Sequence, residues 1–227
     1  MRRFADRTEA GRALAEAVSG RPCPEPLVLA LPRGGVPLGV EIARALAAPL
    51  DLVMVRKVGV PGQPELAAAA VVDGTPPEIV VNDEVAAAAR LDEAEIARLA
   101  ERELAEIARR RTRYLAGRRP IPVEGRCAIV VDDGIATGAT VRAALKGLRR
   151  RRPARLALAV PLAPAETLDA LATEVDDVVC LRTPSPFRAI GAHYEDFTQV
   201  SDEEVVRSLA AAAAAVRSGT ASGNDGS

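Results

Sequence analysis

The sequence predicts an α/β fold: a doubly wound, mostly parallel sheet with helices on both faces. Two observations carry this prediction. Short apolar runs that suit buried strands, such as residues 27–31 and 128–131, alternate with segments whose apolar residues recur at helical spacing. A helical segment also separates the first two predicted strands, and a strand–helix–strand unit of this kind pairs its strands in parallel. Ligands of such sheets bind at the carboxyl ends of the strands.

The composition is that of an ordinary globular protein. The chain has 227 residues, 48% of them hydrophobic, and a formal net charge of -1. The balanced charge gives no indication of a nucleic-acid partner, and the apolar runs are too short to span a membrane. The amino terminus has no apolar secretory segment, so we expect a cytoplasmic protein. We expect one domain over residues 1–210, with its core at 27–181, and a flexible tail at 211–227.

The amino-terminal part predicts a capped helix and the first strand–helix–strand unit. Asp6 and Glu9 have the spacing of a helix cap, so a helix is expected from there to about residue 18. The elements expected next are a strand at 27–31, a helix at 36–47 and a strand at 51–55. The segment 56–65 contains several Gly and Pro residues and is predicted to be a mobile loop.

The remaining segments continue the alternation. Residues 91–115 predict one long helix, because its first turn is acidic and its last turn is basic, as the helix dipole favours. It lies in an expected helical insertion at about 83–120. The other expected elements are strands at 68–72, 78–81, 128–131, 155–160 and 177–181, a helix from about 139 to 150, a short helix at 164–171 and a final helix from 202.

The cysteines predict no metal site. Cys23, Cys127 and Cys180 are widely separated and form no Cys-x-x-Cys pair. Cys127 and Cys180 occupy apolar strand positions, which favours small buried hydrophobic side chains over ligands or nucleophiles.

The most informative segment is residues 129–140, where an apolar strand ends in two adjacent acids, Asp132 and Asp133. A loop of small and hydroxyl residues follows and opens a helix. Free amides at a helix amino terminus favour a phosphate, and paired carboxylates suit sugar hydroxyls or a divalent metal. The segment therefore predicts a site for a phosphorylated sugar. The loop residues are Ala136, Thr137, Gly138, Ala139 and Thr140.

This motif resembles the fingerprint of type I phosphoribosyltransferases, which bind phosphoribosyl pyrophosphate (PRPP). The resemblance implies that Asp132 and Asp133 bind the ribose hydroxyls, contribute to catalysis and hold magnesium, and that residues 136–140 wrap the 5′-phosphate. It further implies transfer of the phosphoribosyl group to a small nitrogen-containing acceptor such as a nucleobase, with release of pyrophosphate. Mg²⁺ as cofactor and a homodimer are part of the same expectation.

Two other segments fit this family. Arg33, Gly34 and Gly35 are similar to its pyrophosphate loop, where glycines let a ligand approach the backbone. Pro-Arg-Gly-Gly is a common turn composition, so the position of this loop after a parallel strand carries the argument. Arg56 and Lys57 resemble a basic pair of adenine-type members and would act in catalysis by neutralising the departing pyrophosphate.

The departures from the family pattern bear on the acceptor. Members that act on 6-oxopurines carry an acid where this chain has Ala136, which argues against hypoxanthine or guanine. Residues 58–65 would correspond to the family's flexible lid, which excludes water. This lid is not rich in lysine as in orotate members, and Glu65 is its only acid. The identity of the base therefore stays open.

Base recognition is expected in a hood at about 183–200. Phe187, Tyr194 and Phe197 are three of the five aromatic residues in the chain. Tyr194 and Phe197 are expected to form the hood's own core, whereas Phe187 could stack on a base. His193, the only histidine, is expected to be structural.

Two other functions compete with the enzyme. A regulatory protein could bind PRPP or a nucleotide at the same loop without useful catalysis, and the helical insertion favours this alternative. The basic pair and the expected lid favour the enzyme. A haloacid- or kinase-like phosphate enzyme is a third possibility, but the chain has neither a Walker lysine nor a nucleophilic-aspartate motif.

Overall fold

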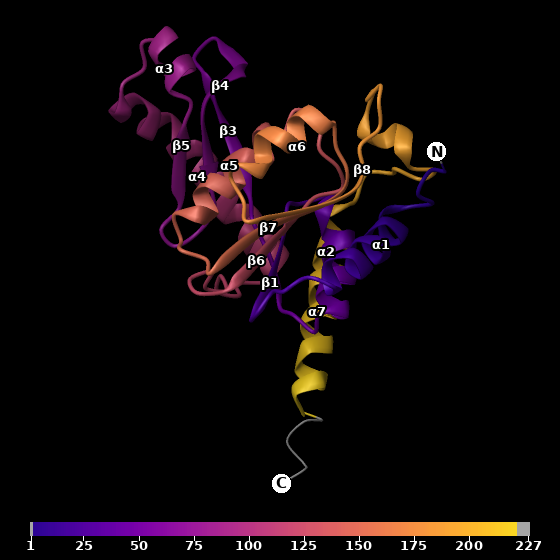
Figure 1. Cartoon of the computed structure of the whole chain (residues 1–227). Coiled ribbons are helices and arrows are strands. Elements are labelled where there is room, and N and C mark those ends of the chain that lie inside the picture. Colours follow the sequence, from indigo (N-terminus) through magenta and orange to yellow (C-terminus); the bar gives the residue numbers. More distant parts are fainter. Residues whose placement is uncertain (1, 222–227) are drawn as a thin grey trace.

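The computed structural model describes residues 2–221. Its centre is a five-stranded sheet in the order β2-β1-β6-β7-β8 (Figure 1). All four neighbouring pairs are parallel, which confirms the predicted sheet. The strands are β1 (Pro26–Ala30), β2 (Leu50–Leu52), β6 (Cys127–Val131), β7 (Arg155–Leu162) and β8 (Asp177–Arg182).

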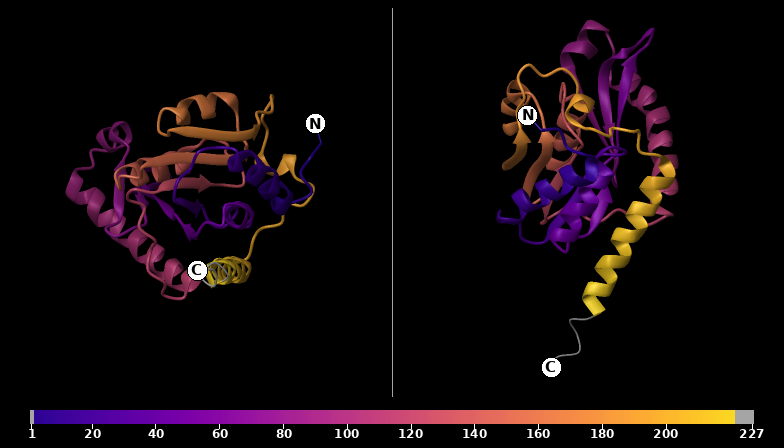
Figure 2. Two further views of the ribbon diagram at one scale, coloured as in Figure 1. Left: turned by 60° about the horizontal axis from the view of Figure 1, so that its bottom comes forward. Right: turned by 90° about the vertical axis from the view of Figure 1, so that its right-hand side faces the viewer.

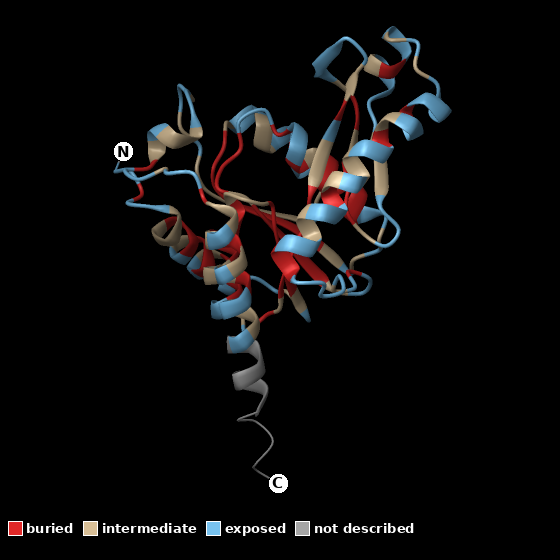
Figure 3. Cartoon of the chain, turned by 180° about the vertical axis from the view of Figure 1, so that it is seen from behind, coloured by how far each residue is buried: buried red, intermediate tan, exposed pale blue. Residues whose placement is uncertain are grey.

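Helices cover both faces of this sheet, as the doubly wound fold requires. Val28 and Ile129 pack with the apolar faces of α1 and α2, whereas their strand neighbours Leu29 and Val130 pack with α5 on the other side. The strands are accordingly buried between two layers (Figure 3). The helices are α1 (Arg7–Ser19), α2 (Gly35–Ala45), α3 (Asp83–Ala88), α4 (Glu93–Leu115), α5 (Ala139–Arg149), α6 (Ala165–Ala172) and α7 (Asp202–Ala221), with a 3-10 turn η1 (Ile190–His193).

A second, antiparallel sheet contains β3 (Val55–Val60), β4 (Gln63–Val72) and β5 (Glu78–Val81). The prediction of a mobile loop at 56–65 is therefore wrong, because β3 and β4 form a hairpin. Its turn lies at Pro61 and Gly62, and Gly62 has a φ of 81° that favours glycine. The Gly and Pro residues thus form the tip and edge of a hairpin, and Val58 anchors its base in the core.

A buried cluster of charges joins the small sheet to the main one. The Nη2 of Arg111, in α4, donates to both carboxylate oxygens of Asp51 at 2.9 and 3.0 Å. Its Nη1 pairs with Asp73, the residue after β4. Burial raises the pKa of Asp73, and the nearby charge of Arg111 opposes that rise. The long helix of the insertion therefore fixes the position of the small sheet.

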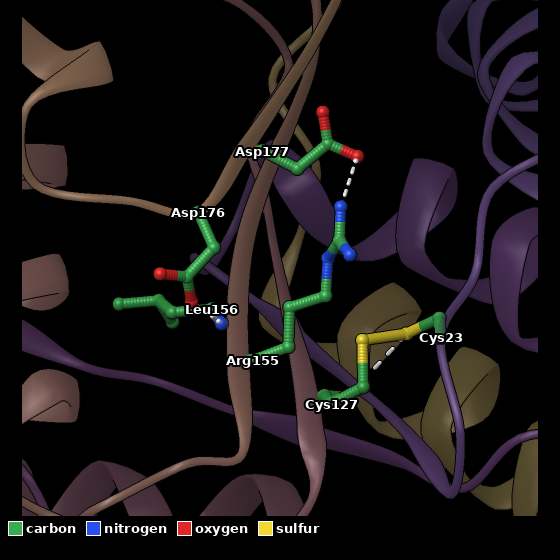
Figure 4. Close-up of a disulfide and its surroundings, with 6 residues drawn as sticks. All are labelled: Cys23, Cys127, Arg155, Leu156, Asp176 and Asp177. Carbon is green, nitrogen blue, oxygen red and sulfur yellow. Dashed lines mark hydrogen bonds and ion pairs between the residues drawn. A yellow bond between two sulfur atoms is a disulfide. The ribbon is translucent and has the colours of Figure 1, made fainter.

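Cys127 is buried as predicted, but it is not a lone hydrophobic side chain. It forms a disulfide with Cys23 across 104 positions of sequence (Figure 4). The bond tethers the link before β1 to the first residue of β6, at the amino edge of the sheet. The expectation of unpaired small side chains was wrong for Cys127, because only the parallel pairing of β1 with β6 brings the two cysteines together.

The carboxyl-terminal helix is longer than expected. It continues to Ala221 and extends away from the rest of the molecule (Figure 2). The helix includes the alanine run at residues 210–215, and alanine has the highest helix propensity of the amino acids. Residues 222–227 of the expected tail lie outside the described residues.

Within residues 2–221, no helix has both the length and the apolar character needed to cross a membrane.

Candidate active site

The acid pair and the glycine loop lie side by side at the carboxyl edge of the main sheet. β1 and β6 are neighbours, with Ala30 opposite Val131. The amide of Leu31 donates to the carbonyl of Val131 at 2.9 Å, so the pairing continues into the loops. The loops after β1 and β6 both leave the sheet at its carboxyl edge, where ligands of such folds bind.

The glycines allow the loop after β1 to approach the acid pair closely. A Cβ on Gly34 would overlap the Asp133 carboxylate, and a Cβ on Gly35 would overlap the carbonyl oxygen of Val131. The Pro32–Arg33 peptide bond in this loop is cis. The Arg33 guanidinium turns toward α7, where its Nη1 lies 3.5 Å from Asp202.

The two adjacent aspartates have different surroundings. Asp132 is partly exposed, and its Oδ1 accepts the backbone amide of Asp133 at 2.9 Å. Asp133 is buried, with 9% of the residue exposed. Burial, and then the charge of Asp133, raise the pKa of Asp132 well above its usual value. Burial also raises the pKa of Asp133, but the hydrogen bond and charge of Arg7 oppose that rise. Both carboxylates would therefore gain from a cation or a hydroxyl donor.

Arg7 holds Asp133 in place, and the sequence analysis did not single it out. From the first turn of α1, its Nε donates to Oδ2 of Asp133 at 2.8 Å. Its Nη1 donates to the carbonyl of Thr198 at 2.8 Å, and its guanidinium lies 3.9 Å from the centre of the Phe197 ring. Arg7 and Asp133 are 126 positions apart, so no local sequence pattern connects them.

Tyr194 fixes the backbone of the acid pair from the hood. Its hydroxyl donates to the carbonyl oxygen of Asp133 at 2.6 Å, and burial raises its pKa, so it remains a proton donor at neutral pH. The ring packs against Phe4 and Phe197 at centroid distances of 5.7 and 5.0 Å. Tyr194 and Phe197 thus pack in the main apolar core together with Phe4 of the amino-terminal segment, rather than in a separate core of the hood.

The predicted base contact, Phe187, is stacked on His193. Their ring centroids are 5.8 Å apart with an interplanar angle of 28°. Burial, followed by the charges of Arg182 and Arg3, lowers the pKa of His193, which favours a neutral imidazole. A role for Phe187 in base binding stays a prediction.

The predicted phosphate loop opens α5 with its donors available. Gly138 precedes the helix with a φ of 74°, in the left-handed region where glycine is favoured. Within residues 2–221, no acceptor takes the backbone amide of Ala136, Thr137 or Gly138. The side chains of Thr137 and Thr140 are exposed beside them. These donors form the kind of helix amino terminus that binds a phosphate.

A cavity of about 530 Å³ lies between this loop and the small sheet. One wall is the first two turns of α5 with Arg142, and the opposite wall is the alanine-rich face of β4 with Lys57 of β3. Asn82, Asp83 and Glu84 complete its rim. The volume is within the range of small-molecule pockets.

The structure separates the predicted basic pair. Adjacent strand residues point to opposite faces of a sheet. Arg56 points to α4, where its Nε donates to Glu103 at 2.7 Å, whereas Lys57 lines the cavity. Within residues 2–221, Lys57 has no ionic partner, so it is the member of the pair available to an anionic ligand.

A metal would have to rely on the acid pair. The described part of the chain contains no cluster of three or more His, Cys, Asp or Glu side chains that could hold a metal ion. Mg²⁺ is often held by one or two carboxylates together with substrate phosphates. Asp132 and Asp133, whose pKa values are raised, therefore fit Mg²⁺ that arrives with a phosphorylated substrate.

Comparisons with known proteins show the family of this chain. A family model described as a phosphoribosyl transferase domain matches residues 7–196. Two proteins from Mycobacterium tuberculosis strains, provisionally named phosphoribosyl transferases, are 46% identical over 209 residues and match 92% of this chain. The chain spans only about half, 47%, of the length of these curated relatives. The crystal structure of TT1426 from Thermus thermophilus is 42% identical, covers 92% of this chain and 98% of its own, and has a TM-score of 0.81.

Proposed function

This chain belongs to the phosphoribosyl transferase family, and we propose that it transfers the phosphoribosyl group of PRPP to a nitrogen nucleophile, with a nucleobase as the best candidate. One observation carries the proposal. An acid pair, a phosphate-type loop and a glycine loop lie at one edge of the sheet, and these groups would suit a phosphorylated pentose that carries a pyrophosphate.

Each part of PRPP has a matching set of groups. The 5′-phosphate would accept from the amides of residues 136–140 and from the hydroxyls of Thr137 and Thr140. Asp132 would accept from a ribose hydroxyl, because a charged acceptor strengthens such a bond. The backbone amides of Arg33 and Gly34 would donate to the pyrophosphate, whereas the Gly35 amide already donates to the Leu31 carbonyl at 3.0 Å. Asp132 and Asp133 would hold Mg²⁺, which neutralises phosphate charge when it is bound.

The reaction needs no covalent protein nucleophile. The bond between C1 of the ribose and the pyrophosphate oxygen breaks, and the leaving group takes both electrons. The acceptor nitrogen forms the new bond to C1 and loses its proton. The positive charge that develops on the ribosyl group is stabilised by nearby carboxylates, and the protein contributes mainly positioning and electrostatics.

Lys57 and the β3–β4 hairpin would serve this chemistry from the small sheet. The Lys57 ammonium, unpaired in the cavity among the described residues, would neutralise charge on the phosphates. Arg56, engaged by Glu103, would contribute only after a rearrangement. The exposed hairpin tip, which includes Glu65, would act as the lid that excludes water from the ribosyl cation.

A PRPP-binding regulator is the second candidate, and the separated basic pair favours it. A regulator needs the acid pair and phosphate loop, but it does not need cations at the leaving group. Mg²⁺ dependence and a homodimeric state, which the resemblance to the family implies, and a cytoplasmic location also belong to this proposal.

The test compares the wild-type chain with the double variant D132N/D133N. Calorimetry with PRPP and MgCl₂ measures binding, and pyrophosphate release across a panel of nucleobases measures turnover. We expect the double variant to lose at least about 100-fold in PRPP affinity, because it removes both charged acceptors of the ribose and the metal.

The matched control is D176N/D177N, which removes another adjacent aspartate pair at the opposite edge of the sheet. This variant should bind PRPP like the wild type. No heat from the wild-type chain would contradict the proposed function altogether. Binding without pyrophosphate release for any base would identify the regulator instead.

A further inference from the structure

The two negative charges of Asp132 and Asp133 are only partly compensated, and the compensating positive charge is that of Arg7. The Asp133 carboxylate faces Arg7 from α1 and the backbone at Gly34, and the hydroxyl of Tyr194 from the hood binds the backbone carbonyl of Asp133. Among the described residues, only Arg7 brings a positive charge into hydrogen-bond contact with either acid. The side chains of Arg7 and Asp133 are 11% and 12% exposed, so water screens this pair little.

Arg7 is held rigidly enough to orient its partner. The Thr198 carbonyl fixes Nη1, the Phe197 ring covers the face of the guanidinium, and Nε is left for Asp133. On its other side, the Asp133 carboxylate is confined by Gly34. Asp132 has no such partner within residues 2–221 and only accepts the Asp133 amide. The two acids are therefore not equivalent.

We propose that Arg7 is a positioning residue that fixes the Asp133 carboxylate and cancels one of the two negative charges of the acid pair, so that the polyanionic substrate can bind. This inference rests on the proposed function, since the substrate it concerns is PRPP. In this arrangement Asp132 has no cationic partner and remains free for a ribose hydroxyl, whereas Asp133 would meet the metal from a fixed position.

The alternative is that Arg7 only attaches the hood to α1, and a matched arginine separates the two roles. Arg182 also stabilises the amino-terminal segment: its guanidinium lies 3.7 Å from the centre of the Phe4 ring, and its Nη1 donates to the Arg2 carbonyl at 2.6 Å. It makes no contact with Asp133. R182M should therefore loosen the hood without changing the charge of the acid pair.

The experiment compares the wild type, R7M, R7K and R182M. Thermal unfolding shows that each variant is folded, and calorimetry with PRPP and MgCl₂ gives the affinity of each. We expect R7M to bind PRPP about tenfold more weakly or worse, because an unscreened charge pair is lost. R7K keeps the charge and should recover part of the affinity.

Rescue by the conservative variant distinguishes a positioning role from a structural one. R7K keeps a cation beside Asp133 and should bind PRPP more tightly than R7M, whereas R182M should keep the wild-type affinity. Equal PRPP affinities of R7M and R182M, with melting temperatures lowered alike, would overturn the inference while leaving the proposed function intact. A wild-type protein that does not bind PRPP would instead refute the proposed function and this inference with it.

Discussion

The chain contains adjacent aspartates at both ends of its main sheet, and the two pairs have opposite surroundings. Asp132 and Asp133 follow β6 at the carboxyl edge, whereas Asp176 and Asp177 precede or open β8 at the amino edge. At the amino edge, Asp176 accepts two hydrogen bonds from Arg149 at 2.9 and 3.1 Å. It also accepts the amide of Leu156 at 2.7 Å (Figure 4).

The balance of charge differs accordingly. Asp177 pairs with Arg155 at 3.3 Å and with Arg21, so the amino-edge pair is met by several cations. The hydrogen bond from Arg149 lowers the pKa of Asp176, whereas burial raises the pKa of both Asp132 and Asp133. The same dipeptide is thus stabilised at one edge and left short of positive charge at the other. The comparison teaches that the environment, rather than the dipeptide, indicates a ligand site.

The largest effect is expected from crowding at the carboxyl edge. G34A would place a methyl group in the position of the Asp133 carboxylate. Either the loop or the Arg7–Asp133 pair must move, and overpacking of this kind costs roughly 1–3 kcal/mol of the free energy of unfolding. The displaced carboxylate should also weaken PRPP binding. Urea unfolding and calorimetry measure the two effects.

G20A is the matched control for that substitution. A Cβ on Gly20 would meet no atom within 4 Å, and this glycine has an ordinary φ of -80°. Its stability and affinity should stay close to those of the wild type. If G34A behaved like G20A, the Asp133 carboxylate would be free to move. The contrast between this confined acid and the more exposed Asp176 at the other edge would then not hold.

The next effect concerns the amino-edge pair. D176N/D177N should lower the free energy of unfolding at neutral pH by about 1 kcal/mol, a modest value because the Arg149–Asp176 pair is about 42% exposed. The pKa of Asp176 is lowered on folding, so its contribution is present above the pKa of the unfolded chain and is lost as the pH falls.

Urea unfolding at several pH values measures this dependence. The difference between D176N/D177N and the wild type should shrink as the solution is acidified, and high salt should reduce it as well. A difference that grew toward acid pH would mean that these carboxylates are destabilising, like those at the other edge.

The parts of the site that sequence could predict are those set by local pattern. An apolar run, two acids and a small-residue loop placed β6, Asp132, Asp133 and the start of α5 correctly. The prediction that both loops follow parallel strands correctly put the loop at Gly34 and the acid pair on the same edge of the sheet. These features depend on hydrophobic burial and turn chemistry within a few residues.

The parts that sequence could not predict depend on distant partners. The contact of Arg7 with Asp133 and the disulfide of Cys23 with Cys127 join residues more than 100 positions apart. The β3–β4 hairpin was missed because Gly and Pro indicate a loop as strongly as they indicate a hairpin tip. Because Arg56 and Lys57 lie in a strand, their side chains point to opposite faces of the sheet. The sequence pattern of two adjacent basic residues does not indicate this separation.

The smallest expected effect is an increase in the free energy of unfolding, and it directly tests the difference between the two aspartate pairs. The pKa of Asp132 is raised on folding, so its ionisation at neutral pH opposes folding. D132N removes that cost, and we expect the free energy of unfolding to increase by about 0.5–1 kcal/mol at pH 7 while PRPP binding is lost. The gain should disappear below the pKa of the unfolded carboxyl group, where the wild-type Asp132 is protonated in both states.

Urea unfolding of D132N and of the single variant D176N, over the same pH series, provides the comparison. A loss of stability in both variants at pH 7 would show that the carboxyl-edge acids stabilise the fold as the amino-edge acids do. An increase in the free energy of unfolding of D132N, but not of D176N, would show that Asp132 destabilises the folded protein. Such a cost is expected at a site where a ligand supplies the missing positive charge.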